Sequence, residues 1–173
     1  MNDTATSAPP ATGTPYVVPA QTRIGHIHLQ VTDLEKALAF YQGILGFQVM
    51  QRFGDQVAFI SAGGYHHHIG LNTWHSKGGP PARKEGAGLY HTAILYPTRA
   101  DLAEAVRRLA AANYPITGAA DHGVSEAVYL DDPDGNGVEL YWDRPHEQWP
   151  MAPDGGVQMY THRLDMAGLL AEK

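Results

Sequence analysis

Apolar and polar positions between residues 23 and 75 follow the order strand, helix, strand, strand, strand. Residues 24–31 alternate apolar with polar side chains, which is the period of a half-buried strand. From Leu34 onward, apolar residues recur at helical spacing on one face, and Gly46 is suited to end that helix. Three further strands are expected, at residues 47–52, 56–61 and 66–73.

The same order of elements returns in the second half of the chain, which indicates an internal repeat. A strand is expected at 89–96, and a helix follows in which apolar residues share one face from Leu102. Later strands fit residues 115–118, 125–131 and 137–142. Residues 76–81 are rich in Gly and Pro and form a flexible joint between the copies. The sequence therefore predicts an α+β fold of two βαβββ modules.

Each predicted helix is preceded by a capping motif. Thr32 is followed three residues later by Glu35, and Thr98 is followed at the same distance by Asp101. In such a motif the hydroxyl and the later carboxylate accept hydrogen bonds from backbone amides that have no partner within the helix. We therefore expect the threonine hydroxyls to cap both helices.

The segments outside the repeat have a different composition. Residues 1–20 are mostly Thr, Ala, Ser, Pro and Gly and bury too little surface to offset the entropy of ordering them. The expected divisions are a disordered arm at 1–20, one domain at 21–145 with modules at about 23–75 and 88–145, and a tail at 146–173. The tail is irregular, with a short helix possible at 165–172.

Composition excludes several classes of protein. The formal net charge of -6 and the low count of 12 Lys and Arg argue against a nucleic-acid binder, because binding phosphates depends on cationic side chains. No apolar run is long enough to cross a membrane, and no basic amphipathic stretch suggests a membrane surface. The N-terminus lacks the pattern of a secretory signal, so a cytoplasmic location is expected. With no cysteine, a metal could bind only through nitrogen and oxygen ligands.

Two of the ten histidines occupy nearly equivalent places in the two modules. His26 lies six residues before Thr32 (32 − 26 = 6), and His91 lies seven before Thr98 (98 − 91 = 7). Imidazole is the commonest neutral metal ligand in proteins. If the modules pack with pseudo-twofold symmetry, these histidines could converge on one cavity, whereas modules packed back to back would keep them apart.

Several stretches resemble the vicinal oxygen chelate superfamily, which includes glyoxalases, fosfomycin resistance enzymes and extradiol dioxygenases: GHIHLQVTDLEKALAFYQGILGF, LYHTAILYPTRADL and YLDDPDGNGVELYWDRP. Within it, SAGGYHHHIGLNTW and SEAVYLDDPDGNGVELYWDRP resemble the catechol 2,3-dioxygenase branch. The resemblance covers about residues 23–145. It implies paired modules that form a half-open β-barrel around a metal. Members of that branch generally have four modules, however, whereas this chain has two, which leaves substrate range and packing open.

The resemblance also implies a set of metal ligands. The family places one His on the first strand of each module and a Glu on the last strand, and these positions match His26, His91 and Glu139. Two histidines and one carboxylate suit non-heme Fe(II), with Mn, Ni, Zn or Co as alternatives. An ordinary reading is also open, in which these residues are core and surface side chains. His28, on the same strand face as His26, is expected to line the cavity or to support a ligand.

The family pattern suggests three catalytic residues. His68, in the tract His66–His68, corresponds either to a fourth ligand of glyoxalases or to the acid–base histidine of extradiol enzymes. Tyr129 lies across a hairpin from Glu139, where related enzymes carry a tyrosine that binds a substrate oxygen. His122 is a second candidate acid–base group. Each of these could also be an ordinary loop or core residue.

The function implied is extradiol ring cleavage, in which Fe(II) and O2 open a catechol or substituted catechol. The expected apolar wall of the cavity includes Phe59, Trp74 and Trp142, although each could be core. A glyoxalase-type lyase or isomerase is the first alternative, and a non-catalytic protein that binds a small molecule is the second. The partners expected are a small aromatic diol and O2, and a homodimer is possible on family grounds.

Overall fold

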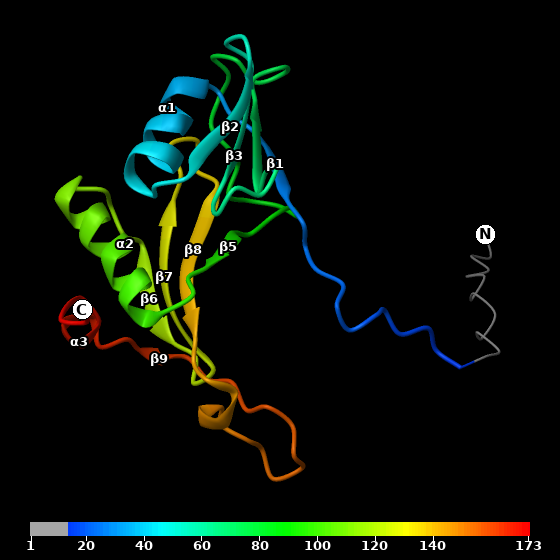
Figure 1. Ribbon diagram of the computed structural model, residues 1–173, viewed down its shortest axis with the longest axis vertical. Coiled ribbons are helices and arrows are strands. Elements are labelled where there is room, and N and C mark those ends of the chain that lie inside the picture. Colours follow the sequence, from blue (N-terminus) through cyan, green and yellow to red (C-terminus); the bar gives the residue numbers. More distant parts are fainter. Residues whose placement is uncertain (1–13) are drawn as a thin grey trace, which may run out of the picture.

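The computed structural model describes residues 14–173. Most of the predicted disordered arm, residues 1–13, lies outside the described residues. Residues 14–20 are exposed and form neither helix nor strand. They belong to a segment that runs away from the body of the molecule before β1 begins (Figure 1).

The first module forms a four-stranded sheet with a helix packed on one face. Its elements are β1 (Ile27–Gln30), α1 (Leu34–Leu38), the π-helix η1 (Ala39–Ile44), β2 (Gln48–Phe53), β3 (Val57–Ser61) and β4 (Ile69–Asn72). The strand order is β1-β4-β3-β2, and β1 runs parallel to β4. The predicted helix is therefore present, although its second half has the wider π geometry.

The second module repeats this arrangement and extends it by one strand. Its elements are β5 (Thr92–Leu95), α2 (Arg99–Ala111), β6 (Gly118–Asp121), β7 (Ser125–Asp131) and β8 (Gly137–Asp143). After β8 come the 3-10 helix η2 (His146–Gln148), β9 (His162–Arg163) and α3 (Met166–Leu170). The strand order is β5-β8-β7-β6-β9, with β5 parallel to β8. The expected α+β fold of two βαβββ modules is confirmed.

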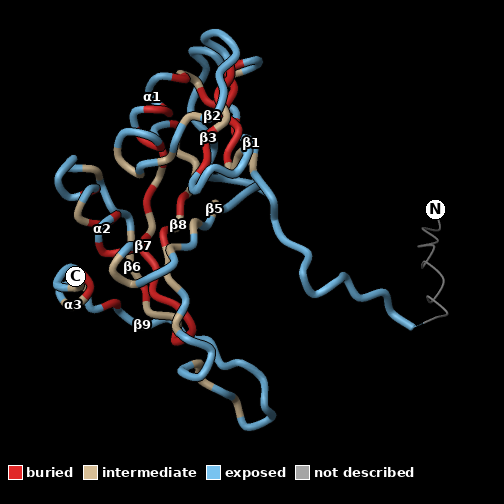
Figure 2. The backbone as a smooth tube through the Cα atoms, in the orientation of Figure 1, coloured by how far each residue is buried: buried red, intermediate tan, exposed pale blue. Residues whose placement is uncertain are grey.

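Helices cover only one face of the two sheets (Figure 1). Leu29, Leu71 and Leu140 point toward the helices and are buried, while His28 on the other face of β1 is exposed. The buried stretches of the sheets in Figure 2 lie beneath α1 and α2. One hydrophobic core runs through both modules. The polar residues of the sheets therefore collect on the face that no helix covers, because strand side chains alternate between faces.

Polar contacts join the two modules as well. The Tyr41 hydroxyl donates to Oδ2 of Asp132 at 3.0 Å, and both side chains are buried. Arg108 of α2 donates to the carbonyl oxygens of Gly43 and Ile44. Arg108 thereby satisfies carbonyls at the end of the first helix that have no partner within it.

The cap of the first helix differs from the prediction. Asp33, not Thr32, accepts hydrogen bonds from the amides of Glu35 and Lys36, at 2.9 and 3.1 Å. Thr32 instead turns to Asp134 in the other module, whose Oδ2 accepts from the Thr32 amide at 3.1 Å. A tertiary partner has replaced the local cap. The second cap was predicted correctly, since Thr98 Oγ1 accepts from the amide of Asp101 at 3.1 Å.

Two strand boundaries and the order of the tail also differ from the prediction. The predicted strand 66–73 contains only Ile69–Asn72, so the histidine tract precedes it, and the predicted strand 115–118 lies later, at Gly118–Asp121. The tail is more ordered than its composition indicates, because β9 pairs with β6 and both Leu164 and Leu169 are buried.

Within residues 14–173 no helix is both long and apolar enough to span a bilayer.

Candidate functional site

His26 and His91 each stand directly before the first strand of their module. His26 precedes Ile27 and His91 precedes Thr92, the first residues of β1 and β5. The sheet register relates them further, because Ile27 pairs with Ile69 on β4 and Thr92 pairs with Val138 on β8. The equivalence expected from the capping motifs is therefore confirmed at the level of the strands.

His91 lies in contact with Glu139. The two atoms His91 Nε2 and Glu139 Oε2 are 2.8 Å apart, and the side chains are 31% and 13% exposed. The contact follows from the parallel pairing of β5 with β8, which sets Ala93 beside Glu139. Gly137 allows this approach, because a methyl group there would overlap the Tyr90 carbonyl oxygen and touch His91 Cβ at 3.0 Å.

Tyr129 and His122 extend this contact into a chain. Tyr129 is paired with Glu139 across the β7–β8 hairpin, and its hydroxyl donates to Oε1 of Glu139 at 3.1 Å. On its other side the same hydroxyl lies 2.7 Å from His122 Nε2. Burial and the neighbouring Glu139 carboxylate raise the pKa of Tyr129 to about 12. The phenol therefore keeps its proton at neutral pH.

The contacts of His122 and Tyr129 limit where the protons of this hydrogen-bonded series can lie. His122 Nδ1 lies 2.9 Å from the carbonyl oxygen of Tyr160, which can only accept, and 3.3 Å from the Thr161 hydroxyl; the shorter carbonyl contact favours a proton on Nδ1. The single phenol proton of Tyr129 can be donated to Glu139 or to His122 Nε2. When it goes to Glu139, the phenol oxygen is left to accept from Nε2, which then carries a proton. A proton can therefore pass from His122 through Tyr129 toward the position of Glu139.

Sequence reasoning did not find the part that Tyr160 plays. Its contribution is a backbone carbonyl, which every residue type possesses, and it belongs to a segment 38 residues from His122 (160 − 122 = 38). No residue-type pattern marks such a contact. Only the pairing of β9 with β6 brings it to His122.

His26 is not gathered with the other two predicted ligands. Its ring lies against His67, with ring centroids 4.5 Å apart. Among residues 14–173, no three His, Asp or Glu side chains are close enough together to hold a metal ion. The nitrogen and carboxylate donors at His91 and Glu139 suit a divalent metal of the first transition row. The structure thus assembles two of the three predicted ligands, and the third lies on the other sheet.

His68 belongs to a local cluster in the first module. Its Nδ1 lies 2.9 Å from Ser61 Oγ and 3.3 Å from the amide of Ala62, which donates to it. The neighbouring His66 and His67 contact each other, with their Nδ1 atoms 2.8 Å apart. No hydrogen bond among the described residues joins His68 to the chain of His122, Tyr129 and Glu139.

The predicted aromatic wall is divided between the two faces of the sheets. His28 has Phe59 and Trp74 as neighbours, at centroid distances of 5.9 and 5.6 Å, so these three rings gather on the uncovered face. Trp142 packs instead against the hydrophobic core beneath the helices. For Trp142 the alternative of a core residue is confirmed, because it shares the face of β8 with Leu140 whereas Glu139 points the other way.

The place of Glu139 is taken by a glycine in the first module. His28 pairs with Gly70 as Ala93 pairs with Glu139, so Gly70 is the counterpart of Glu139. A side chain at Gly70 would collide with His28, whose Cδ2 would lie 2.9 Å from the added carbon. The repeat therefore supplies a carboxylate from one module only.

A cleft of about 780 Å³ opens beside this site. It lies between residues 82–91 and strands β6 to β8, and its walls include His91 and Tyr129. A small ring with polar substituents would fit in a cavity of this size. The phenol of Tyr129 and the imidazole of His91 are the site groups that a molecule in the cleft would meet.

Comparison with known proteins agrees with this architecture. Residues 23–140 match the model of the glyoxalase/bleomycin resistance protein/dioxygenase superfamily. The chain belongs to this superfamily. A glyoxalase/dioxygenase structure from Nostoc punctiforme superposes with a TM-score of 0.61 at 20% identity, covering 78% of this chain and 100% of that one. At that identity the superposition supports the fold alone.

Two curated members of the superfamily are similar in sequence. Catechol-2,3-dioxygenase of Bacillus subtilis (strain 168) is 42% identical over 151 residues, 87% of this chain and 52% of that protein. Biphenyl-2,3-diol 1,2-dioxygenase 3 of Rhodococcus globerulus is 31% identical over 121 residues, 70% of this chain and 63% of that protein. This superfamily member therefore spans little more than half the length of the curated dioxygenases it matches.

Proposed function

We propose that this protein is an extradiol dioxygenase, which uses O2 to open the ring of a catechol or substituted catechol beside its two hydroxyls. The observation that carries the proposal is the hydrogen-bonded chain from His122 through Tyr129 to Glu139 and His91. Its members His91 and Tyr129 line the cleft. The names of the similar proteins, both dioxygenases of aromatic diols, support the same chemistry.

The proposal includes a divalent metal, Fe(II), held by His91 and Glu139 with His26 as the third ligand. A metal bound there supplies a template and Lewis acid for the diol and the oxygen molecule. Two imidazoles and one carboxylate suit Fe(II). His26 lies against His67 in this structure, so its ring would have to leave that contact to complete the set.

The protein's own residues would manage the protons of the diol. Tyr129, which stays protonated, would donate a hydrogen bond to a substrate oxygen in the cleft and fix the orientation of the ring. His122 would take a proton from the diol through Tyr129 onto Nε2 and return it later. Imidazole suits this task because it titrates near neutral pH. His68 is left out of this transfer, because no hydrogen bond among the described residues joins it to Tyr129.

The glyoxalase-type alternative is less well supported. That chemistry would use a fourth protein ligand from the first module, and Gly70 stands where the counterpart of Glu139 would be. His68 also has partners of its own. A protein that only binds a small molecule remains as an outcome of the test below. The cytoplasmic location and the homodimer remain predictions, which cell fractionation and light scattering would test.

The test is to mix the protein, reconstituted anaerobically with Fe(II), with catechol in air-saturated buffer. We expect oxygen uptake and a yellow ring-opened product. No uptake with catechol, methylcatechols or biphenyl-2,3-diol, in protein shown to contain iron, would contradict the proposal. Tight binding of these diols without turnover would indicate a binding protein. Isomerase activity with Ni or Zn would support the glyoxalase-type alternative.

A further inference from the structure

The loop that carries His122 is covered by the C-terminal segment. Strand β9 runs antiparallel to β6, with His162 beside Asp121. The Tyr160 amide donates to the His122 carbonyl at 3.3 Å, and Nδ1 of His122 lies 2.9 Å from the Tyr160 carbonyl oxygen and 3.3 Å from the Thr161 hydroxyl. Tyr160 thus contacts both the backbone and the ring of His122.

These contacts bear on which nitrogen of the neutral imidazole has the proton. A carbonyl oxygen only accepts, so its 2.9 Å contact favours the proton on Nδ1, whereas the Thr161 hydroxyl, at the longer distance of 3.3 Å, could accept from Nδ1 or donate to it. Nε2 is then free of hydrogen and faces the Tyr129 hydroxyl at 2.7 Å. With the other tautomer, the Tyr160 carbonyl would lose its donor and Nε2 could not accept a proton from Tyr129. The position of the ring against Tyr160 is therefore a condition for His122 to act as a base.

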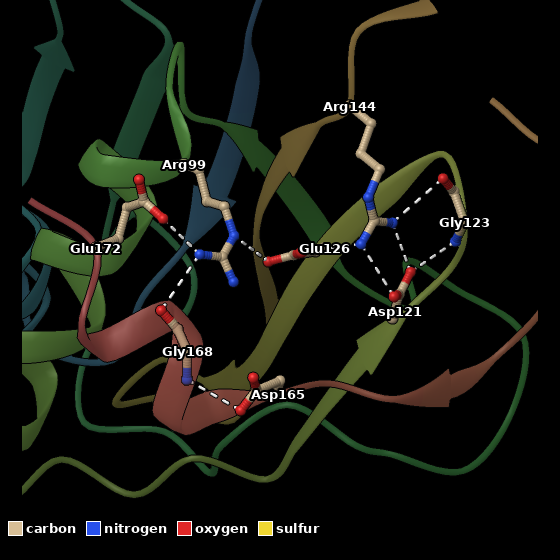
Figure 3. A network of polar contacts seen from close by, with 8 residues as sticks. All are labelled: Arg99, Asp121, Gly123, Glu126, Arg144, Asp165, Gly168 and Glu172. Carbon is tan, nitrogen blue, oxygen red and sulfur yellow. Dashed lines mark hydrogen bonds and ion pairs between the residues drawn. The ribbon is translucent and has the colours of Figure 1, made fainter. Parts of the chain in front are cut away.

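Arg144 forms hydrogen bonds to both neighbours of His122 in the turn, Asp121 and Gly123. Its Nη1 and Nη2 atoms donate to Oδ1 and Oδ2 of Asp121 at 2.6 and 3.0 Å, and Nη1 also donates to the Gly123 carbonyl at 3.2 Å. The Asp121 carboxylate in turn accepts from the Gly123 amide at 2.8 Å. Figure 3 shows the guanidinium facing both of the residues that flank His122. A planar fork is needed for this grip, and a lysine could not reproduce it.

A second arginine, Arg99, binds Glu126 as Arg144 does but makes no contact with the Asp121–Gly123 turn. The buried Glu126 carboxylate accepts from Arg144 Nη2 at 2.9 Å and from Arg99 Nε at 2.8 Å. Arg99 then binds α3 and its end, through the Gly168 carbonyl and the Glu172 carboxylate (Figure 3). The two arginines are alike in burial, with side chains 18% and 22% exposed. They provide a matched pair, in which only Arg144 contacts the residues around His122.

We propose that Arg144 is a positioning residue, which holds the Asp121–Gly123 turn so that His122 gives Nδ1–H to the Tyr160 carbonyl and presents a bare Nε2 to Tyr129. The positioning of His122 by Arg144 is inferred from the contacts described above. Its catalytic consequence rests on the proposed function, in which His122 is the base. Arg144 itself touches neither Tyr129 nor Glu139 among the described contacts.

The tautomer can be measured without metal or turnover. Nitrogen-15 spectra of the histidine side chains would be recorded on the metal-free protein at a pH of about 8, where an ordinary imidazole is neutral. The His122 signals would be assigned from their loss in His122→Gln. We expect the Nδ1–H form of His122 in the parent protein and in Arg99→Lys, and a mixture of both tautomers in Arg144→Lys. An unchanged His122 spectrum in Arg144→Lys, or an equal change in Arg99→Lys, would overturn the proposal.

Kinetics with Fe(II) and catechol provide the second readout. We expect Arg144→Lys to lower kcat about tenfold with KM changed less than about twofold, because a displaced base affects the reaction rather than binding. A changed tautomer with unchanged kcat would overturn the catalytic consequence. If the parent protein opens no diol ring, the proposed function fails while the spectra still decide the positioning. Should Arg144→Lys not fold, Asp121→Asn, which removes the ion pair between Arg144 and the turn, is measured in its place.

Discussion

His91 Nε2 and Glu139 Oε2 lie 2.8 Å apart although β5 and β8 are separated in the chain by a helix and two strands. An imidazole nitrogen and a carboxylate that lie together beside a cleft are two groups that can both act as ligands of a metal cation. The parallel register of the two strands creates this pair, and Gly137 keeps room for it.

The first prediction concerns metal binding by this pair. In Glu139→Gln we expect Fe(II) affinity to fall at least about tenfold, because a neutral amide replaces the anionic ligand. Anaerobic titration with Fe(II), followed by metal analysis after gel filtration, measures the change. Asp143→Asn on the same face of β8 is the control and should bind as the parent does. Equal affinity in the parent protein and Glu139→Gln would remove Glu139 from the metal site.

The second prediction concerns the Tyr129 hydroxyl. Tyr129→Phe keeps the ring but removes the group that joins His122 to Glu139. We expect kcat for diol cleavage to fall by about a hundredfold, in the usual range for loss of a proton-transfer group. Oxygen uptake under saturating diol measures it. Tyr141→Phe, two residues beyond Glu139, should retain its activity. Full activity in Tyr129→Phe would exclude the proposed route for the proton.

The third prediction concerns stability at acid pH. The hydrogen bonds from Arg144 hold the pKa of the Asp121 carboxyl below its ordinary 3.8. Because the folded pKa lies below the unfolded one, the stabilisation is present above about pH 3.8 and is lost as the pH falls through the folded pKa. Asp121→Asn should therefore lower the free energy of unfolding by about 2 kcal/mol at pH 7.

Urea denaturation of the two proteins at a series of pH values measures this difference. We expect the two free energies of unfolding to approach each other as the pH drops below about 3.8. A difference that stays constant between neutral and acid pH would show that the carboxylate charge contributes nothing.

The fourth prediction concerns the close approach at Gly137. A methyl group there would overlap the Tyr90 carbonyl oxygen, so Gly137→Ala must displace the start of β5. We expect a loss of about 1–3 kcal/mol in the free energy of unfolding, typical of overpacking. Gly25→Ala is the control, because a methyl group there meets no atom within 4 Å. Thermal unfolding compares the two, and equal melting temperatures would contradict the packing argument.

Much of the fold follows from local patterns along the chain. The alternation in 24–31 and the helical spacing after Leu34 are physical consequences of burying one face, so they can be seen in the sequence. The repeat then relates His26 to His91, and the structure keeps that equivalence. The cap at Thr32 was mistaken, because Asp134 of the other module binds both its hydroxyl and its amide.

The candidate site, too, was predicted in part from the sequence and decided in part by the tertiary structure. The sequence alone pointed to Glu139 and Tyr129 as cross-strand neighbours, since a tight hairpin fixes which residues face each other. Which histidine joins them was open between His68 and His122. The structure favours His122, because its ring reaches the Tyr129 hydroxyl while His68 stays with Ser61.

Local sequence thus determined the strands, the helices, the internal repeat and the types of donor available. Tertiary structure alone decided that the Tyr160 carbonyl and the Arg144 guanidinium hold His122, and that His26 lies with His67. The reason is physical. Periodicity records which face of an element is buried, whereas contacts between distant elements depend on register and on how the two sheets are placed, which no local pattern encodes.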